Sequence, residues 1–232
     1  MTKKIDCISV GDIQTNCWLY LLEGELTDSG ESNSKSCIII DPGDEAELIL
    51  NRLKELNWIP SGIFLTHGHF DHLSALPKLL VGLKKTFDGL EPKIGIHRKD
   101  AHYLGKNSLA VHQAGFAAVG GNPAYVETLF NSLPEADIVF EEGDTAGPFK
   151  VLHLPGHTPG SAGFFDEKGD ILFTGDTLFN GDWGRTDLPG GSEAQIKQSL
   201  RRILSLKGKI MVLPGHGPAS TIEAETGLLK YL

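Results

Sequence analysis

The sequence predicts a layered α/β fold, and three observations support this prediction. Short apolar runs typical of strands recur along the 232 residues, and each ends at a turn or loop that carries Gly, Pro, Asp or His. Segments with helical periodicity lie between several of these runs. No internal repeat, low-complexity tract or change in composition marks a boundary inside the chain. We therefore expect helices that cover one sheet or a pair of sheets, in a single domain over residues 1–232.

The predicted strands are short and apolar. The first two, residues 17–22 (CWLYLL) and 36–41 (SCIIID), flank a polar segment at 23–36. We expect this Gly- and Ser-rich segment to be a solvated hairpin connection. The other candidate strands are residues 62–66, 93–97, 149–154, 163–166, 170–176 and 209–216.

Three segments predict helices. Residues 45–57 place five apolar side chains on one face and carry acidic residues early, as the helix dipole favours. A second helix should begin at Ser192, because Gln195 follows it in the spacing of a capping box. Ser220 and Glu223 repeat this spacing before a final short helix. Each apolar stripe should pack on the predicted sheets.

Residues 101–134 have the least regular pattern in the chain. Apolar residues are scattered there around VGGNP, and no strand or helix period is sustained. We expect short helices packed near the functional site.

Composition and charge narrow the expected partners. The formal charge is −9 with no Lys/Arg cluster longer than a pair, which disfavours nucleic acid. No run approaches the roughly 18 apolar residues of a membrane span. Cys7, Cys17 and Cys37 are odd in number and lack C-x-x-C spacing, so reduced, buried thiols are expected. These features predict a cytoplasmic protein that acts on a small molecule, and they do not predict its oligomeric state.

Residues 64–72 (FLTHGHFDH) crowd His67, His69, Asp71 and His72 behind an apolar run. Any one of these histidines alone would more simply be a satisfied core or surface residue. Imidazoles crowded without a metal would repel one another when protonated and lose solvation when buried. Imidazole nitrogens and carboxylate oxygens are ligands that zinc, iron and manganese accept. The cluster therefore predicts a metal site at the end of a strand.

Three later positions repeat this arrangement: His157 in LPGHTPG, Asp176 in LFTGDTLF and His216 in VLPGHGP. Each follows an apolar strand with glycine alongside, and glycine lets the backbone turn sharply out of a strand. Singly, each could be only a turn residue or a helix cap. Together, seven residues are enough for two metal ions, with Asp176 as a bridge. The predicted ligands are His67, His69, Asp71, His72, His157, Asp176 and His216.

Asp41 in IIDPGD ends a strand similar in pattern to the strand that carries His67. It could cap the following helix or accept a hydrogen bond behind a ligand histidine, and we favour the second role. The other histidines lie outside any matching motif, and we expect ordinary structural roles for them. They are His97, His102, His112 and His153.

The H-x-H-x-D-H motif with distant His, Asp and His resembles the metallo-β-lactamase-fold hydrolases. The resemblance covers nearly the whole chain, from QTNCWLYLL and IIDPGD to PGHG, and implies an αββα sandwich. It also implies two divalent metal ions with a water or hydroxide and Asp176 between them. The implied ligands are His67, His69 and His157 for one ion and Asp71, His72 and His216 for the other. We expect zinc, and the same ligands would hold iron or manganese.

Hydrolysis is the reaction class expected of two neighbouring metal ions, because they activate water and polarise a carbonyl. A thiolate leaving group, with a pKa of about 8.5, can depart without a general acid. Phosphodiester cleavage on RNA would instead need a basic surface and a proton donor. We therefore expect a thioesterase in which Asp71 orients a metal-bridging hydroxide for attack on the carbonyl.

Residues 178–191 (LFNGDWGRTDLPGG) resemble a segment of the single-domain, glyoxalase II-like (hydroxyacylglutathione hydrolase-like) group. A related G-R-T-D segment occurs in persulfide dioxygenases of the same fold. Arg185 could bind a substrate carboxylate, or it could staple the loop through Asp182 or Asp187, which we favour.

Glutathione recognition is the main departure from this pattern. Two-domain glyoxalase II enzymes continue into a helical domain that supplies much of the glutathione contact, whereas 16 residues follow His216 here. A different thiol carrier, or another small ester or lactone, is the alternative within hydrolysis.

Two other classes of function compete with hydrolysis. The resemblance also allows a mononuclear iron persulfide dioxygenase that uses His67, His157 and Asp176. Purely structural metals are disfavoured, because seven ligands exceed one closed tetrahedral site. A β-lactamase is disfavoured, because Asp176 stands where a thiolate ligand would be expected.

Overall fold

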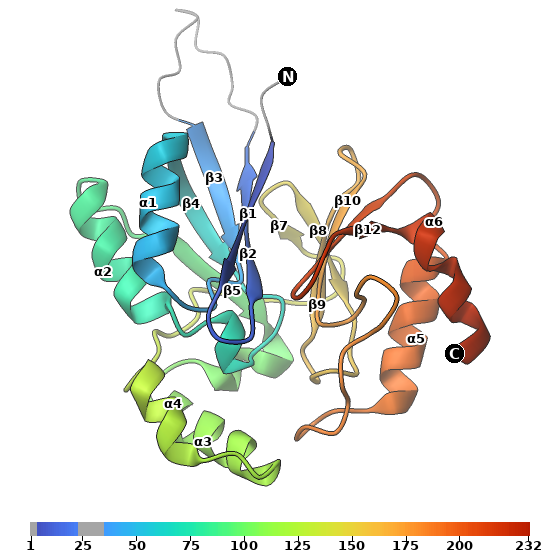
Figure 1. The fold of residues 1–232 in the computed structure, drawn as a ribbon. Helices are drawn as coiled ribbons and strands as arrows, with labels where there is room; N and C mark the ends of the chain where they lie inside the picture. The colour runs from blue at the N-terminus through green and yellow to red at the C-terminus, as the bar shows by residue number, and fades with distance from the viewer. Residues whose placement is uncertain (1–3, 23–34) are drawn as a thin grey trace, which may run out of the picture.

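Two six-stranded sheets stack face to face, with helices on the outer face of each (Figure 1). The computed structural model describes residues 4–22 and 35–232, so the predicted hairpin connection at 23–36 lies largely outside the described residues. This order of helix, sheet, sheet and helix is the predicted αββα sandwich.

The first sheet has the order β1-β2-β3-β4-β5-β6, antiparallel from β1 to β3 and parallel from β3 to β6. Its strands are β1 (Ile5–Val10), β2 (Thr15–Leu21), β3 (Lys35–Ile40), β4 (Trp58–Phe64), β5 (Lys93–His97) and β6 (Ile138–Phe140). Its outer face carries α1 (Ala46–Leu56) and α2 (Leu76–Thr86) (Figure 1).

The second sheet has the order β12-β11-β10-β9-β8-β7, and only β10 and β11 run parallel. Its strands are β7 (Thr145–Ala146), β8 (Phe149–His153), β9 (Ala162–Asp166), β10 (Ile171–Gly175), β11 (Met211–Pro214) and β12 (Ser220–Thr221). The helices α5 (Glu193–Leu204) and α6 (Ile222–Glu225) cover its outer face, followed by the 3-10 helix η3 (Thr226–Tyr231) (Figure 1).

Three apolar clusters hold these layers together. One lies between the first sheet and its helices, one between the two sheets, and one between the second sheet and α5. The middle cluster is rich in aromatic rings, which pack edge to face; the centroids of Tyr20 and Phe149 lie 4.8 Å apart. The packed rings of this middle cluster therefore hold the two sheets face to face.

The predicted helix at 45–57 is confirmed as α1, which buries Ala46, Ile49, Leu50 and Leu53. The sequence did not predict α2. This helix contains Gly82, and an added Cβ there would lie 2.1 Å from Leu50 Cδ1. A larger residue there would displace the Leu50 methyl group, so Gly82 favours the close approach of α1 and α2 although glycine weakens the helical pattern.

Ser192 caps α5 as predicted, because its Oγ accepts a hydrogen bond from the Gln195 backbone N–H. The reciprocal bond of a capping box does not form, since the Ser192 N–H donates to the Gly156 carbonyl. The box predicted at Ser220 is wrong by one residue. Thr221 caps α6 by accepting from the Ala224 N–H, whereas Ser220 lies in β12.

Residues 101–134 form short helices, as expected. They are α3 (Ser108–Ala118) and α4 (Pro123–Leu129), preceded by the 3-10 helix η2 (Arg98–Tyr103). The pair α3 and α4 stands at one end of the molecule, beyond both sheets (Figure 1).

Two further findings concern composition. Cys17 and Cys37 are buried as expected, but Cys7 is exposed because it points away from the buried face of β1. Among the described residues, no helix is long and apolar enough to cross a membrane.

The stacked rings of His97 and His153 predict acid sensitivity. Their centroids lie 4.2 Å apart, and burial, with the neighbouring His153, lowers the pKa of His97 to about 4. The unfolded chain binds this proton near pH 6.5, whereas the native state resists it. The free energy of unfolding should therefore fall as the pH drops from 6.5 towards 4.

We expect His97→Phe, which keeps a ring against His153, to lose less stability over this range than the wild-type protein. Urea midpoints at pH 7.5 and 5 measure the difference, and His102→Phe at an exposed position is the control. An equal loss in His97→Phe and wild type would contradict the assignment to His97.

Candidate metal centre

All seven predicted ligands lie on loops that leave strand ends at one end of the sandwich. The loop after β4 carries four of them, and the loops after β8, β10 and β11 carry one each. A short 3-10 helix, η1 (Phe70–His72), orients the last two of the four. Side chains that are far apart in the sequence therefore converge because their strands end together.

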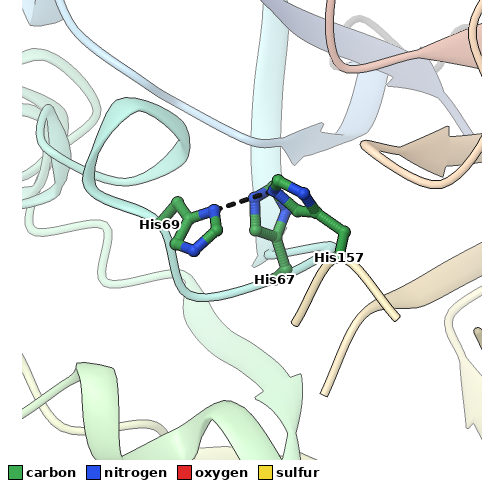
Figure 2. Close-up of side chains that lie close together, drawn as sticks. All are labelled: His67, His69 and His157. Carbon is green, nitrogen blue, oxygen red and sulfur yellow. Dashed lines mark hydrogen bonds between the residues drawn. The ribbon is translucent and has the colours of Figure 1, made fainter. Parts of the chain in front are cut away.

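The first group consists of His67, His69 and His157, whose rings face one another (Figure 2). His69 Nδ1 and His157 Nε2 lie 2.8 Å apart. The ring centroid of His67 lies 4.8 Å from that of each of the other two. These three imidazoles surround one point.

The second group consists of Asp71, His72 and His216. Asp71 Oδ2 lies 3.2 Å from His72 Nε2 and 3.2 Å from His216 Nε2. The two histidine nitrogens are 3.3 Å apart. One carboxylate and two imidazoles thus surround a second point.

Asp176 lies between the two groups. Its Oδ1 is 3.4 Å from His72 Nε2, and its Oδ2 is 3.6 Å from both His157 Nε2 and His216 Nε2. Its carboxylate therefore reaches toward both groups at once.

Asp41 lies behind this cluster. Its Oδ2 is 3.0 Å from His72 Nδ1 and accepts from Thr66 Oγ1 at 2.6 Å, and Thr66 Oγ1 is 3.1 Å from His67 Nδ1. The carboxylate can only accept, so His72 donates through Nδ1, and the Thr66 hydroxyl in turn accepts from His67. In the neutral form of each ring, Nε2 is then the unprotonated nitrogen, and it points into the cluster. Asp41 does not cap α1.

Backbone carbonyls fix two other rings in the same way. His157 Nδ1 donates to the Arg185 carbonyl at 2.7 Å, and His216 Nδ1 donates to the Ile13 carbonyl at 3.1 Å. A carbonyl accepts and cannot donate, so each Nε2 again carries its lone pair toward the cluster. Four rings are therefore held in the tautomer that binds a metal through Nε2.

The donor set fits metal ions on geometric grounds. Two ligands on a tetrahedral ion at about 2.0–2.1 Å lie roughly 3.3 Å apart. The donor pairs measured above are 2.8–3.6 Å apart, and all donor atoms of each group lie within 4.8 Å of one another. Among the side chains that the structure describes, His67 Nε2 and Asp176 Oδ1 are buried polar atoms with no hydrogen-bond partner. Such atoms are costly unless a ligand satisfies them.

The charges also favour a cation. Burial lowers the pKa of His67, and it lowers the pKa of His69 to about 3, so both are neutral as ligands must be. Burial opposes protonation of His72 as well, but neighbouring carboxylates, Asp71 first among them, outweigh it and raise its pKa. The carboxylates thus stabilise positive charge at this position, where a divalent ion would replace the proton.

Glycine is required where the loops approach one another. Gly175 has φ of 48°, which turns the chain out of β10 directly before Asp176. At Gly215 an added Cβ would lie 2.2 Å from Asp176 Oδ1 and 2.6 Å from His72 Cε1. Any side chain at Gly215 would displace Asp176 and His72.

Asp100 ties two ligand loops together, and the sequence did not reveal it. Its buried carboxylate accepts from the Gly68 N–H at 2.9 Å, the Thr158 hydroxyl at 2.7 Å and the Gly160 N–H at 2.7 Å. Gly68 lies between two predicted ligands, and Thr158 follows a third. An aspartate just past β5, at the strand ends that carry the ligands, was the available signal.

A cavity of about 690 Å³ opens onto the cluster. His69, Asp71, His157, Asp176 and His216 contribute to its wall. Its size is that of a small-molecule site. The cluster is therefore accessible to a small substrate.

The histidines outside the motifs lie in different places. His112 is buried, its Nε2 donates to the Tyr103 carbonyl at 3.0 Å, and its ring lines the cavity. His97 and His153 stack away from the cavity, and His102 is exposed.

Comparison with known proteins identifies the family to which this chain belongs. Residues 10–216 match the Metallo-beta-lactamase superfamily. A relative named hydroxyacylglutathione hydrolase GloC, from Haemophilus influenzae, is 35% identical over 96% of this chain and 94% of its own.

Two solved structures share the arrangement. The crystal structure of TTHA1623 in a di-iron-bound form is 33% identical, with a TM-score of 0.72 over 98% of this chain and 100% of that one. The crystal structure of BLEG-1 B3 metallo-beta-lactamase is also 33% identical, with a TM-score of 0.74 over 98% and 99%. Both relations extend over essentially the whole chain.

Proposed function

The chain belongs to the metallo-beta-lactamase superfamily, and on that premise we propose that it hydrolyses small thioesters as hydroxyacylglutathione hydrolases do. The observation that carries the proposal is the convergence of two donor groups, with a carboxylate between them, at one cavity. The name of the relative from Haemophilus influenzae supports the choice of thioesters.

We assign one divalent metal ion to His67, His69 and His157, a second to Asp71, His72 and His216, and a bridging role to Asp176. Zinc is the expected ion, and the His/Asp donor set would also accept iron or manganese. When bound, such ions polarise the substrate carbonyl and make a water nucleophilic at neutral pH.

Asp71 is the residue that we assign to the catalytic step. Its Oδ2 accepts a hydrogen bond from Thr15 Oγ1 at 3.3 Å, and its carboxylate lines the cavity. This hydrogen bond holds the carboxylate where it can orient the attacking water and accept its proton. The leaving thiolate needs no proton donor, since its pKa is near that of free cysteine.

The first experiment is hydrolysis of S-lactoylglutathione, followed by loss of the thioester absorbance, with metal-free and metal-reloaded protein. The proposal predicts hydrolysis that depends on metal. Oxygen consumption with a persulfide substrate, without thioester hydrolysis, would indicate the dioxygenase alternative. Because one structural relative is named a B3 metallo-beta-lactamase, a β-lactam substrate belongs in the same assay as the competing hydrolysis.

Arg185 gives a test of substrate contact. Arg185 lines the cavity, and its guanidinium forms two hydrogen bonds of 2.6 Å with the Asp187 carboxylate. A substrate carboxylate would have to displace this bidentate pair. We therefore expect Arg185→Ala to raise KM less than about threefold, with kcat unchanged.

Asp187→Asn is the matched control, because it frees the guanidinium without removing it. If Arg185 binds substrate, Arg185→Ala should raise KM at least about tenfold while Asp187→Asn lowers it. That pair of results would reverse our assignment of Arg185 to the loop.

A further inference from the structure

Residues 107–126 contain no Asp, Glu, Lys or Arg, although they form a surface hairpin. Of the side chains in α3, only Ser108 and His112 are buried. The alanines of α3 at positions 110, 114, 117 and 118 are exposed. An apolar helix pair with so little burial is unusual for a surface element, and such surface marks a binding region.

One side of this hairpin forms a wall of the cavity beside the metal-ligand loops. Phe116, Val119, Tyr125 and Leu129 line it together with Phe70 from the ligand loop. The rings form a continuous layer, because the Phe116 centroid lies 5.4 Å from Phe70 and 5.9 Å from Tyr125. Leu188 and Pro189 add apolar surface to the lining from the loop before α5.

The charges in the cavity lining do not suit an anionic substrate arm. Apart from the proposed ligands, the charged residues in the lining are Asp12, Asp44 and Arg185. Arg185 is neutralised by Asp187, and Asp12 Oδ2 accepts a hydrogen bond from Tyr125 Oη at 3.2 Å. The carboxylates of a glutathione arm would find no unpaired cation among the lining residues.

We propose that the wall formed by Phe70, Phe116, Val119, Tyr125 and Leu129 binds the apolar acyl chain of the thioester, so that the preferred substrates carry an aliphatic acyl group longer than lactoyl. This inference rests on the proposed thioesterase function. The acyl chain of the substrate lies against the hairpin, and its carbonyl lies at the metal-ligand loops. The thiol arm of the substrate points out of the cavity. Hydrolysis then adds water across the C–S bond and yields the acid and the free thiol.

The experiment is a series of N-acetylcysteamine thioesters, which carry an uncharged thiol, with acyl chains from acetyl to octanoyl. The expected result is a rise in kcat/KM of about two- to fourfold for each added CH₂ up to a plateau, as burial of apolar surface predicts. Octanoyl glutathione and octanoyl N-acetylcysteamine should differ little, because the thiol arm lies outside. A flat chain-length series with active protein would overturn the inference.

A matched pair of variants tests whether the acyl chain of the substrate binds at this wall. Val119→Asp places a charge on the cavity wall, and Ala118→Asp places the same charge on an exposed, non-lining position one residue earlier near the same helix end. Val119→Asp should abolish the chain-length dependence, whereas Ala118→Asp should retain it. Equal behaviour of the two variants would contradict the assigned wall.

Binding of a thioether analogue separates this inference from the proposed function. S-octyl-N-acetylcysteamine cannot be hydrolysed, and calorimetry should detect its binding to the wild type and at least about tenfold weaker binding to Val119→Asp. Binding of this analogue without hydrolysis of any thioester would sink the proposed function and leave the apolar site. Hydrolysis without chain-length dependence or analogue binding would sink only the inference.

Discussion

Replacing Asp71 with Ala should lower kcat by at least about 100-fold, the usual minimum for loss of a positioned proton acceptor. The Asp71 carboxylate lies 3.2 Å from both His72 Nε2 and His216 Nε2 and faces the cavity. We measure turnover at saturating metal and count bound metal in parallel. Metal retained with turnover lost indicates the catalytic role, and loss of one ion indicates the ligand role.

Asp44→Ala is the control for this variant. Asp44 lines the same cavity, and its Oδ1 accepts from the neighbouring Glu45 N–H. It should keep both the wild-type turnover and the metal content. An Asp71→Ala protein with near-normal kcat would remove Asp71 from the mechanism.

Replacing Asp100 with Ala should weaken metal binding about 10- to 100-fold, the range seen when groups that orient ligands are removed. The variant leaves two buried N–H groups, of Gly68 and Gly160, and the Thr158 hydroxyl without their acceptor. Unsatisfied buried donors cost about 1–3 kcal/mol each, so the free energy of unfolding should fall by several kcal/mol as well.

Asp100→Asn separates these two effects. Its one carbonyl oxygen can still accept from Gly68 and Thr158, but its amide donor then meets the Gly160 N–H. Competition with a chelator should therefore give a metal affinity between wild type and Asp100→Ala. Wild-type metal affinity in Asp100→Ala would show that the two loops hold their positions without Asp100.

The sequence revealed the seven candidate ligands because each follows an apolar strand and most have glycine nearby. Asp100 was missed for a physical reason. Two of its partners are backbone amides 32 and 60 residues away, and a backbone amide leaves no mark in a sequence. The three-dimensional arrangement of the strand ends is needed to show that the Asp100 carboxylate ties two ligand loops together.

The strand β1 shows a related limit. Asp6 interrupts its apolar pattern, yet Asp6 is buried and Arg52 of α1 donates to it at 2.6 Å. A charged residue within an apolar run argues against a buried strand as long as its partner is unknown. The sequence predicted short helices at 101–134 without a clear period. Many apolar residues of α3 and α4 line the cavity or face solvent, so they do not repeat along one core-facing side.

The most direct test of the account is a titration of metal-free protein with zinc while thioester hydrolysis is followed. Two metal-ligand groups that share Asp176 predict that hydrolysis reaches its plateau at two ions per chain. A plateau at one ion per chain, or one tightly bound iron with oxygen uptake and no thioester hydrolysis, would contradict a binuclear thioesterase.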